Sequence, residues 1–465
     1  MAQQVLPLSH TQEAQWFLYR LAPHSGAYNT GLAVRIRSAV DLARLRHAVA
    51  ALGERHTMLR SRFDVVGGRP VRIEEPLGEP VLTVRELPGA DDPALRAAVR
   101  EELGRPFVPE SGAPFRFVLL TRGPADAVLL VAGHHIATDA ASNALLLGDL
   151  LKGYEHPAPA GPPPAGRYHD HVDKERRLLA SARGTAMGGH WREVCAEVPA
   201  AELPADHRRP DSQSFAGDTL RVTVPPELAG PALSAAAEWG VTPYAFLLAA
   251  FQVVLHRSTR QREFLIGAPV TTRLSSRMRE VVGNFMNTIV LKAAFADGAT
   301  FRDTAVAANE QIRGGMDAGR YPFPLVARES RSRRAAGRSA LFQITFNMLS
   351  TAHAAAGLRP LLDTGDEDRV TRCSGLLLSP WHLPQQEGQV DLAVDVLQSA
   401  EAFAVDFRYD TRLYERATVE RLAGHYLRAV ELAARTPDAR VATAPLWHPV
   451  GTGRPAGLAG LTTTR

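Results

Sequence analysis

Two adjacent histidines followed by an aspartate are the residues of this chain best suited to chemistry. His134 and His135 leave the apolar run DAVLLVAGHHI, and Asp139 lies four residues beyond the second histidine. Imidazole is the usual side chain for proton transfer near neutral pH. Because side chains alternate along a strand, the two rings point in opposite directions, and only one can face a given cavity. Asp139 is better suited to hold the turn, through a bidentate arginine, than to meet a substrate.

Other interpretations of this motif stay open at the level of the residues. Two adjacent histidines can be a hydrogen-bonded pair in the core. A metal site needs further ligands, and no H-x3-H or HExxH pattern accompanies the motif. A serine hydrolase requires a G-x-S-x-G elbow, which we do not find.

Length and composition limit the class of protein. The 465 residues predict two or three packed units, and a 45% hydrophobic, 22% charged chain is ordinary for a globular protein. No stretch approaches the roughly 18 apolar residues that cross a bilayer, the N-terminus has no leader pattern, and two cysteines are too few for a disulfide framework. We therefore expect a cytoplasmic protein without membrane contact.

The positive charge does not indicate a nucleic-acid partner. The net charge is +4, and only three of the 53 basic residues are lysines, which is typical of a GC-rich genome. The densest basic run, residues 328–338, has no interleaved aromatic residues on which bases could stack. We interpret it as a solvated loop, with docking of an acidic protein as the alternative.

Periodicity predicts the elements that must position the motif. Ser9 and Gln12 form a capping box before a first helix, and a strand at 126–136 leads into a helix at 142–154, which we interpret as a βαβ-like passage. Further helices are predicted at 41–54, 170–183, 190–198, 229–256 (in two parts) and 415–435. Further strands are predicted in 55–66 and at 218–224, 264–270, 287–295, 340–349, 389–398 and 402–410.

The run HPAPAGPPPAG at 156–166 is the best linker, because proline removes donors and fixes φ. It divides the chain into a first subdomain at 1–166 and a second at 167–447. Residues 351–389 have weak periodicity, and we expect a long excursion over the surface. The tail at 448–465 is expected to be disordered.

Seven segments, in order, resemble the condensation domains of nonribosomal peptide synthetases, in the chloramphenicol-acetyltransferase-like superfamily. HHIATDA (134–140) resembles the signature HHxxxDG. The other six segments, each similar to a block of the family, are LPLSHTQEAQWFL (6–18), RHTMLRSRF (55–63), RYHDHV (167–172), IGAPVTTR (266–273), VVGNFMNT (281–288) and GRSALFQITFN (337–347). The resemblance covers about residues 5–440.

The resemblance implies an α/β (α+β) fold of two acetyltransferase-like subdomains, arranged as a V-shaped pseudo-dimer around a central tunnel. It implies His135 as the catalytic histidine, beside His134, and Asp139 as a structural residue paired with Arg60 or Arg273. The residues expected to line the tunnel are Gly133, Ala140, Ser142, Gly267, Asn284, Asn287, Ser339 and Gln343.

The implied activity joins an acyl or aminoacyl thioester to an amine or hydroxyl group, forming an amide or ester in natural-product biosynthesis. The donor is a peptidyl carrier protein that supplies 4'-phosphopantetheine, and the acceptor is a small molecule or a second carrier protein. No metal and no tightly bound cofactor are expected. Since no adenylation or carrier segment accompanies the motifs, we expect a free-standing enzyme.

Besides Thr11, which stands in place of an alanine in the opening block, three positions depart from the family pattern. Ala140 replaces the glycine of the signature, Ala340 replaces a proline, and His171 replaces an aromatic residue. Glycine at 140 would allow any φ, so activity should survive alanine there if φ is negative. A non-catalytic recruitment module is the alternative function, and an epimerising relative is a third; cyclising relatives carry aspartates in place of the histidines.

Overall fold

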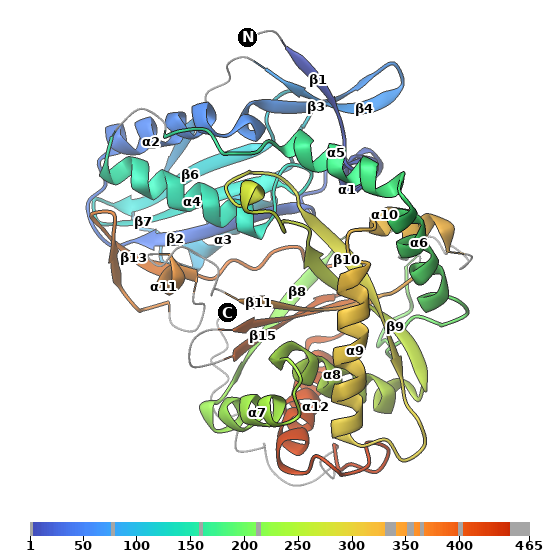
Figure 1. Cartoon of the computed structure of the whole chain (residues 1–465). Coiled ribbons are helices and arrows are strands. Elements are labelled where there is room, and N and C mark those ends of the chain that lie inside the picture. The colour runs from blue at the N-terminus through green and yellow to red at the C-terminus, as the bar shows by residue number, and fades with distance from the viewer. Residues whose placement is uncertain are drawn as a thin grey trace. The chain divides into compact units, whose positions relative to one another are not determined.

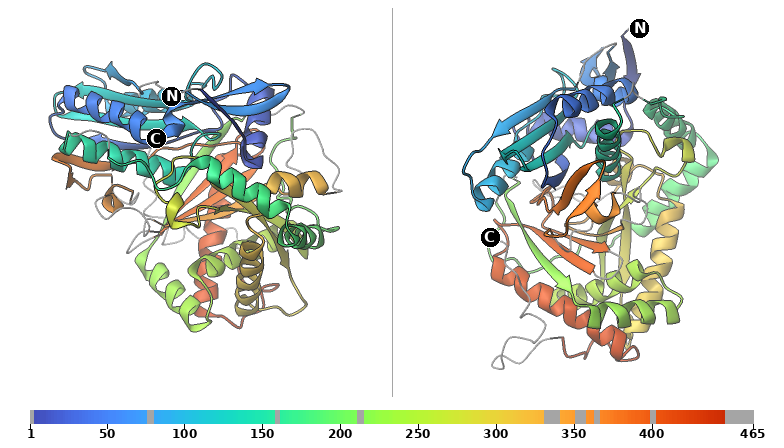
Figure 2. Two further views of the ribbon diagram at one scale, coloured as in Figure 1. Left: turned by 45° about the horizontal axis from the view of Figure 1, so that its top comes forward. Right: turned by 90° about the vertical axis from the view of Figure 1, so that its left-hand side faces the viewer.

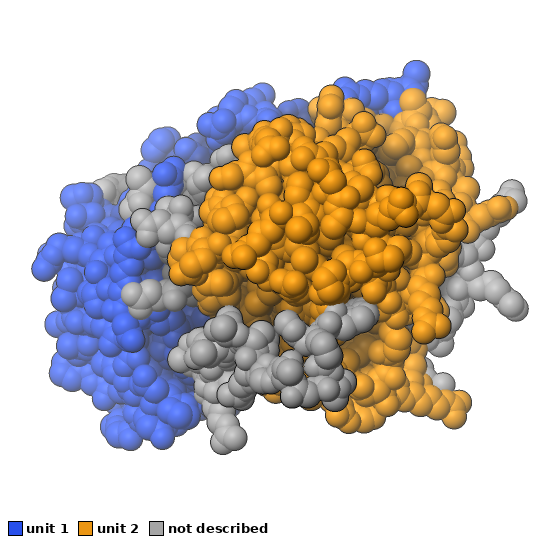
Figure 3. Space-filling view, turned by 90° about the horizontal axis from the view of Figure 1, so that it is seen from below, with its two compact units in different colours: residues 1–184, 271–287, 351–386 blue, residues 185–270, 288–350, 387–465 orange. Residues whose placement is uncertain are grey.

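A computed structural model describes residues 3–75, 80–157, 161–210, 215–330, 341–350, 358–362, 367–398 and 403–446. The chain forms two compact units, coloured separately in Figure 3. The first unit contains residues 1–184, 271–287 and 351–386, and the second contains residues 185–270, 288–350 and 387–465. Each unit is therefore built from three separate stretches of the chain, unlike the single cut at residue 166 that the proline-rich linker predicts.

The first unit is built on a six-stranded sheet (Figure 1). In sheet order its strands are β12 (Thr371–Cys373), β13 (Leu376–Trp381), β2 (Asn29–Ile36), β7 (Asp126–His134), β6 (Phe115–Gly123) and β5 (Leu82–Glu86). Only β5 and β6 are parallel. Because β7 runs antiparallel to both of its neighbours, the βαβ-like interpretation of this passage is wrong.

Among the described residues, a small sheet and six α-helices complete this unit. The small sheet has the order β1 (Gln4–Pro7), β4 (Arg69–Glu74) and β3 (Ser61–Val66). The helices are α1 (His10–Leu21), α2 (Leu42–Arg55), α3 (Asp92–Gly104), α4 (Ala140–Glu155), α5 (Tyr168–Leu179) and α11 (Arg359–Leu362), with short 3-10 helices at Thr57–Arg60 and Ser276–Met278.

Apolar clusters lie on both faces of the six-stranded sheet, which explains why β7 is apolar along its length. Leu129 and Val131 belong to the cluster that holds the apolar residues of α2 and α4. Val128 and Leu130 belong to the cluster that holds those of α3. A strand buried on both faces reads as a continuous apolar run, so the predicted strand at 126–136 is confirmed.

Side-chain caps fix where the helices begin. Ser9 and Gln12 form both hydrogen bonds of the predicted capping box at α1. Asp41 caps α2, and Asp139 caps α4 by accepting a hydrogen bond from the amide of Ser142. The three helices therefore begin within two residues of the predicted positions.

The expectation that residues 351–389 pass over the surface is wrong for the described part of this segment. β12 and β13 form a hairpin, and β13 pairs with β2, so that Leu378 and Ser379 have no exposed surface. Ser374 and Gly375, both with positive φ, form the two-residue turn of the hairpin. β13 has only six residues, which are apolar or small and do not alternate with polar ones. Such a short run does not identify a strand from the sequence alone.

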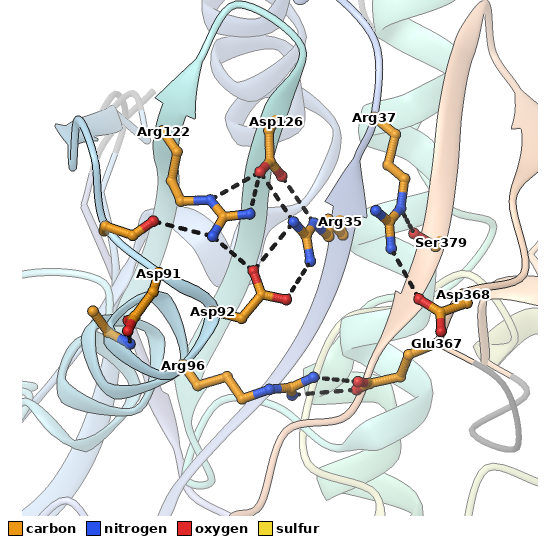
Figure 4. A network of polar contacts seen from close by, with 12 residues as sticks. Arg35, Arg37, Asp91, Asp92, Arg96, Arg122, Asp126, Glu367, Asp368 and Ser379 are labelled. Carbon is orange, nitrogen blue, oxygen red and sulfur yellow. Dashed lines mark hydrogen bonds and ion pairs between the residues drawn. The ribbon is translucent and has the colours of Figure 1, made fainter. Parts of the chain in front are cut away.

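Ion pairs hold the segment 367–381 to the same unit (Figure 4). Arg96 pairs with Glu367, and Arg37 bonds to Asp368 and to the hydroxyl of Ser379. The guanidinium of Arg96 also lies 4.5 Å from the ring centre of Trp381. These contacts thus join α3 and the residue that follows β2 to the segment 367–381.

The second unit has its own six-stranded sheet. In sheet order its strands are β10 (Met286–Ala294), β9 (Glu263–Thr271), β11 (Ile344–Ser350), β14 (Leu392–Gln398), β15 (Phe403–Asp410) and β8 (Gly217–Val224). Its helices are α7 (Pro226–Glu238), α8 (Pro243–Thr259), α9 (Phe301–Asp317), α10 (Phe323–Glu329) and α12 (Arg416–Arg435), and α6 (Ala182–Val194) spans the boundary between the units.

One face of this sheet packs on α8 and α12 (Figure 2). Phe346 of β11 stacks on Phe251 of α8, and Phe407 of β15 meets Tyr426 of α12 edge to face. The predicted antiparallel pair β14 and β15 is confirmed, as is the final helix. Within the described residues no single helix is long and apolar enough to cross a membrane; α7 and α8 reach that length and composition only together, across a bend of 107°.

Candidate active site

The histidine motif lies where a buried strand ends and a helix begins. β7 ends at His134, a short turn follows, and α4 begins at Ala140 with Asp139 as its N-cap. Both elements belong to the first unit. The turn places His135 and Asp139 directly after a strand that is buried at every residue except its first.

His134 is a buried, neutral side chain. It is 3% exposed, its Nδ1 accepts a hydrogen bond from the Ile136 amide at 3.1 Å, and its ring meets that of Tyr19 edge to face. Burial lowers the pKa of His134 to about 3, with a smaller contribution from the charge of His135. His134 is therefore suited to hold the turn rather than to transfer protons.

His135 is partly exposed, and its ring orientation is set by the backbone. Its Nδ1 lies 2.7 Å from the carbonyl oxygen of Thr138, and its own amide donates to the carbonyl of Tyr28 at 2.8 Å. A carbonyl oxygen can only accept, so Nδ1 carries the proton of the neutral ring. The lone pair of the ring is then on Nε2, as a general base requires. The two histidines differ in burial as strand alternation predicts.

Asp139 is paired with Arg273, one of its two candidate partners. Arg273 Nη2 donates to the two carboxylate oxygens of Asp139 at 3.1 and 3.3 Å. Asp139 also accepts from the amides of Ser142, at 2.7 Å, and Phe285, at 3.0 Å. Arg60 ends the 3-10 helix Thr57–Arg60, and its carbonyl accepts from the amide of Glu75.

Arg273 joins the helix start to the segment 271–287. Its Nη1 donates to the carbonyl oxygens of Met278, at 2.8 Å, and Val281, and its Nη2 donates to Ser142 Oγ at 2.7 Å. Its guanidinium also lies 4.0 Å from the ring centre of Phe285. The arginine side chain is 8% exposed and the aspartate side chain 2%, so this pair is shielded from solvent.

Ser142 and Tyr168 bind the backbone of the same segment. Ser142 Oγ donates to the carbonyl of Gly283 at 2.8 Å, and Tyr168 Oη donates to the carbonyl of Asn284 at 2.6 Å. The ring of Tyr168 lies so close that a Cβ on Gly283 would be 2.1 Å from its Cδ2, which requires glycine there. Tyr168 Oη is also 3.3 Å from Ser9 Oγ.

Motifs that are far apart in the sequence therefore meet in the first unit. They are the segments around Ser9, the histidines, Tyr168, Arg273 and Asn284. Gln12 adds a further link, because its Nε2 donates to the carbonyl of Ile136 at 2.9 Å, inside the histidine turn.

His171, which stands in place of an aromatic residue, packs like one. Its ring centre lies 5.5 Å from that of Tyr168 and 4.9 Å from that of Phe285. Burial lowers the pKa of His171, so the neutral ring is the form that fits here.

Ala140 is exposed and is the first residue of α4. It is absent from the described non-glycine residues with positive φ, so the backbone here does not require glycine. Position 133, in contrast, requires glycine for a steric reason, since a Cβ there would lie 2.8 Å from Thr138 Cγ2.

The remaining expected residues lie on the strands of the second sheet or beside them. Gly267 is in β9 and pairs with Thr345 of β11; Gln343, just before β11, and Asn287, in β10, are buried. Gly267 and Gln343 belong to the second unit. Ser339 lies outside the described residues, as do the tail at 448–465 and most of the basic run at 328–338.

Two polar side chains beside the histidines, Thr138 and Asn143, were not predicted as part of the site. Thr138 has no exposed surface and Asn143 is 1% exposed. The available signal was an asparagine near the start of the predicted apolar helix at 142–154. Among the described residues no group of histidine, cysteine and acidic side chains could hold a metal ion.

Comparison with known proteins defines the class. A family model, the condensation domain, matches residues 2–451, so the chain belongs to the condensation-domain family. Domains of this family in general form amide bonds in nonribosomal peptide synthesis. The family membership expected from the motifs is thereby confirmed.

Curated relatives are nonribosomal peptide synthetases. The chain is 29% identical to a component of the linear gramicidin synthase of Brevibacillus parabrevis over 458 residues, which are 96% of this chain and 9% of that protein. It is 30% identical to phosphinothricin tripeptide synthetase PhsC of Streptomyces viridochromogenes over 450 residues, 95% of this chain and 40% of that protein. The chain thus spans less than half the length of these relatives.

Solved structures share the fold. A four-domain nonribosomal peptide synthetase matches with a TM-score of 0.86 at 20% identity, covering 96% of this chain and 34% of that one. The X-domain from teicoplanin biosynthesis matches with a TM-score of 0.82 at 20% identity, over 94% of this chain and 96% of the X-domain. The first condensation domain of the calcium-dependent antibiotic synthetase matches with a TM-score of 0.75 at 21% identity, over 96% of this chain and all of that domain. The expected mixed α/β fold class is confirmed.

Proposed function

We propose that this protein is an acyltransferase that joins a carrier-bound acyl or aminoacyl thioester to an amine or hydroxyl nucleophile. The contact between His135 Nδ1 and the Thr138 carbonyl carries the proposal, because it leaves the lone pair of the ring on Nε2. The ring is also partly exposed at the end of a rigid strand.

In the proposed step, the acceptor nitrogen or oxygen attacks the carbonyl carbon of the thioester. His135 Nε2 takes the proton that the nucleophile loses as the new C–N or C–O bond forms. The tetrahedral intermediate then collapses, the C–S bond breaks, and the thiolate of the carrier takes a proton from the imidazolium. The products are an amide or ester and the free thiol, and His135 returns to its neutral form.

The neighbouring residues have positioning roles in this proposal. His134 and Asp139 hold the turn, and Arg273 and Ser142 tie Asp139 to the segment 271–287. Gly133, Ala140, Gly267, Asn284, Asn287 and Gln343 are proposed to line the path of the substrates, on the basis of their family motifs.

The proposed donor is a peptidyl carrier protein with its 4'-phosphopantetheine arm, which enters as part of the substrate. The acceptor is a small amine or alcohol or a second carrier. The polar contacts around His135 do not depend on which of the two nucleophiles attacks.

Intact-mass analysis of a loaded carrier tests the proposal. A carrier bearing an acyl or aminoacyl group is incubated with the protein and a panel of amines and alcohols. We expect loss of the acyl mass that depends on one acceptor, and a rate about 10²–10⁴-fold lower for His135→Ala. His156→Ala is the matched control, because that side chain is 80% exposed. Undiminished turnover by His135→Ala would falsify the assignment.

A recruitment module is the second candidate, since an X-domain of this fold was solved in complex with OxyB, with a TM-score of 0.83 to this chain. If this protein is a recruitment module, it should bind a partner protein while the loaded carrier keeps its acyl group. The ordered imidazole of His135 favours transfer instead. Epimerisation would leave the mass of the loaded carrier unchanged, so the same measurement separates it from transfer.

A further inference from the structure

The carbonyl of Thr138, which orients His135, is itself held in place by the side chains of Thr138 and Asn143. The side chain of Thr138 is fully buried, and its Oγ1 donates to Asn143 Oδ1 at 2.9 Å. A second acceptor, the carbonyl of Asp139, lies 3.3 Å from the same hydroxyl. Because a hydroxyl has only one proton to donate, and the contact to Asn143 is the shorter of the two, we assign the proton of Thr138 to the hydrogen bond with Asn143.

Asn143 extends this contact to the central sheet. Its Nδ2 donates to Thr30 Oγ1 at 3.4 Å, and Thr30 of β2 is the register partner of Gly133 in β7. Asn143 lies in the first turns of α4 and Thr30 is 4% exposed. The three side chains therefore connect a strand, a helix and the histidine turn inside the first unit.

Steric contact restrains Thr138 from the other side. A Cβ built on Gly133 would lie 2.8 Å from Thr138 Cγ2, so the methyl group occupies the space that the glycine leaves. With its methyl against Gly133 and its hydroxyl on Asn143, the threonine side chain has one rotamer, which fixes the adjoining backbone.

We infer that Thr138 and Asn143 are positioning residues that hold the Nδ1-protonated tautomer of His135. This inference rests on the proposed function for its effect on turnover, but the tautomer itself can be measured without a substrate. Without the hydrogen bond between Thr138 and Asn143, the carbonyl of Thr138 is free to turn away from the imidazole. The proton then distributes between Nδ1 and Nε2, and the fraction of rings that can act as a base through Nε2 falls.

Two substitutions remove this contact from either side. Thr138→Val keeps the shape and the methyl group but removes the hydroxyl, and Asn143→Leu removes the acceptor while Asp139 still offers its carbonyl to the hydroxyl. Thr138→Ser keeps the hydroxyl and is the conservative control. Thermal unfolding identifies variants that fold.

Nitrogen-15 NMR of the histidine rings reads the tautomer, with the His135 signals assigned by their loss in His135→Ala. We expect the Nδ1–H form in the wild type and in Thr138→Ser, and a mixture of tautomers in Thr138→Val and Asn143→Leu. We also expect kcat to fall about 2- to 10-fold in both variants, in proportion to the lost fraction of the Nδ1–H form, with KM changed less, and the pH–rate profile to shift. The double variant should be no slower than the slower single variant, since both act through one contact.

The outcomes separate this inference from the proposed function. Retention of the Nδ1–H tautomer in both Thr138→Val and Asn143→Leu overturns the inference, and so do independent, additive losses of kcat. If the tautomer shifts as expected but His135→Ala transfers acyl groups at the wild-type rate, the inference about His135 stands and the proposed function fails. If only one of the two variants folds, its tautomer and kcat decide in the same way.

Discussion

Asp139 and Arg273, 134 residues apart in the sequence, form a buried ion pair with Nη2 and Oδ1 at 3.1 Å. The pair joins the start of α4, directly after the histidine turn, to the segment 271–287. Because the chain leaves the first unit at residue 184 and returns to it at residue 271, this contact also ties the returning segment to the helix that follows His135.

Removing one partner of this pair should strongly destabilise the protein. Arg273→Met leaves a buried carboxylate without its cation, and a broken buried pair typically lowers the free energy of unfolding by about 3–5 kcal/mol. Denaturant unfolding measures the change. The matched control is Asp297→Asn, which breaks the exposed pair with Arg262 and should change stability by at most about 0.5 kcal/mol. A loss below about 1 kcal/mol for Arg273→Met would contradict the description of the pair as buried.

Acid should destabilise the folded protein through His134. Burial lowers its pKa to about 3 in the folded state, whereas an unfolded histidine titrates near 6.5. The contribution of the neutral His134 to the free energy of unfolding is fully present above about pH 6.5. As the pH falls toward 3 this contribution is lost, by up to about 1.4 kcal/mol per pH unit. His171, whose pKa burial also lowers, acts in the same direction.

The pH dependence of the unfolding free energy tests this. His134→Gln removes the titrating group, so its profile between pH 6.5 and 4 should be flatter than that of the wild type. His156→Gln, at an exposed position, should reproduce the wild-type slope. Equal slopes for wild type and His134→Gln would show that His134 accepts its proton in the folded state as easily as in the unfolded one.

Restoring the glycine of the family signature at position 140 should increase neither the acyl-transfer rate nor the stability. Ala140 is exposed, and its position as the first residue of α4 needs no positive φ. Ala140→Gly should keep the acyl-transfer rate within about twofold and lower stability by at most about 1 kcal/mol, because glycine loses more backbone entropy. A severalfold faster variant would mean that the methyl group obstructs a substrate.

The hairpin that pairs with β2 should depend on packing more than on its ion pairs. Trp381 is 6% exposed in the cluster around α3, and truncating a buried tryptophan typically removes about 3–5 kcal/mol. Glu367→Gln only weakens a partly exposed pair with Arg96, for which we expect about 0–1 kcal/mol. Denaturant unfolding of Trp381→Ala and Glu367→Gln compares the two. A larger effect for Glu367→Gln would reverse this ranking.

Local patterns allowed most long elements and the histidine turn to be predicted. The capping box at Ser9 and the apolar run of β7 each depend on neighbouring residues, so the sequence shows them directly. The hairpin at 371–381 was missed because its strands are short and depend on pairing with β2. The choice between Arg60 and Arg273 needed the tertiary fold, since both are far from Asp139 in sequence. Asn143 was missed because its role comes from a turn that brings it to Thr138.

The assignment of His135 as the catalytic base is tested by the rate of acyl loss from a loaded carrier, measured for wild type and His135→Ala in a single turnover with the accepting amine or alcohol. If His135 takes the proton, the rate should fall about 10²–10⁴-fold in His135→Ala and stay unchanged in His156→Ala. Equal rates for all three proteins would contradict it.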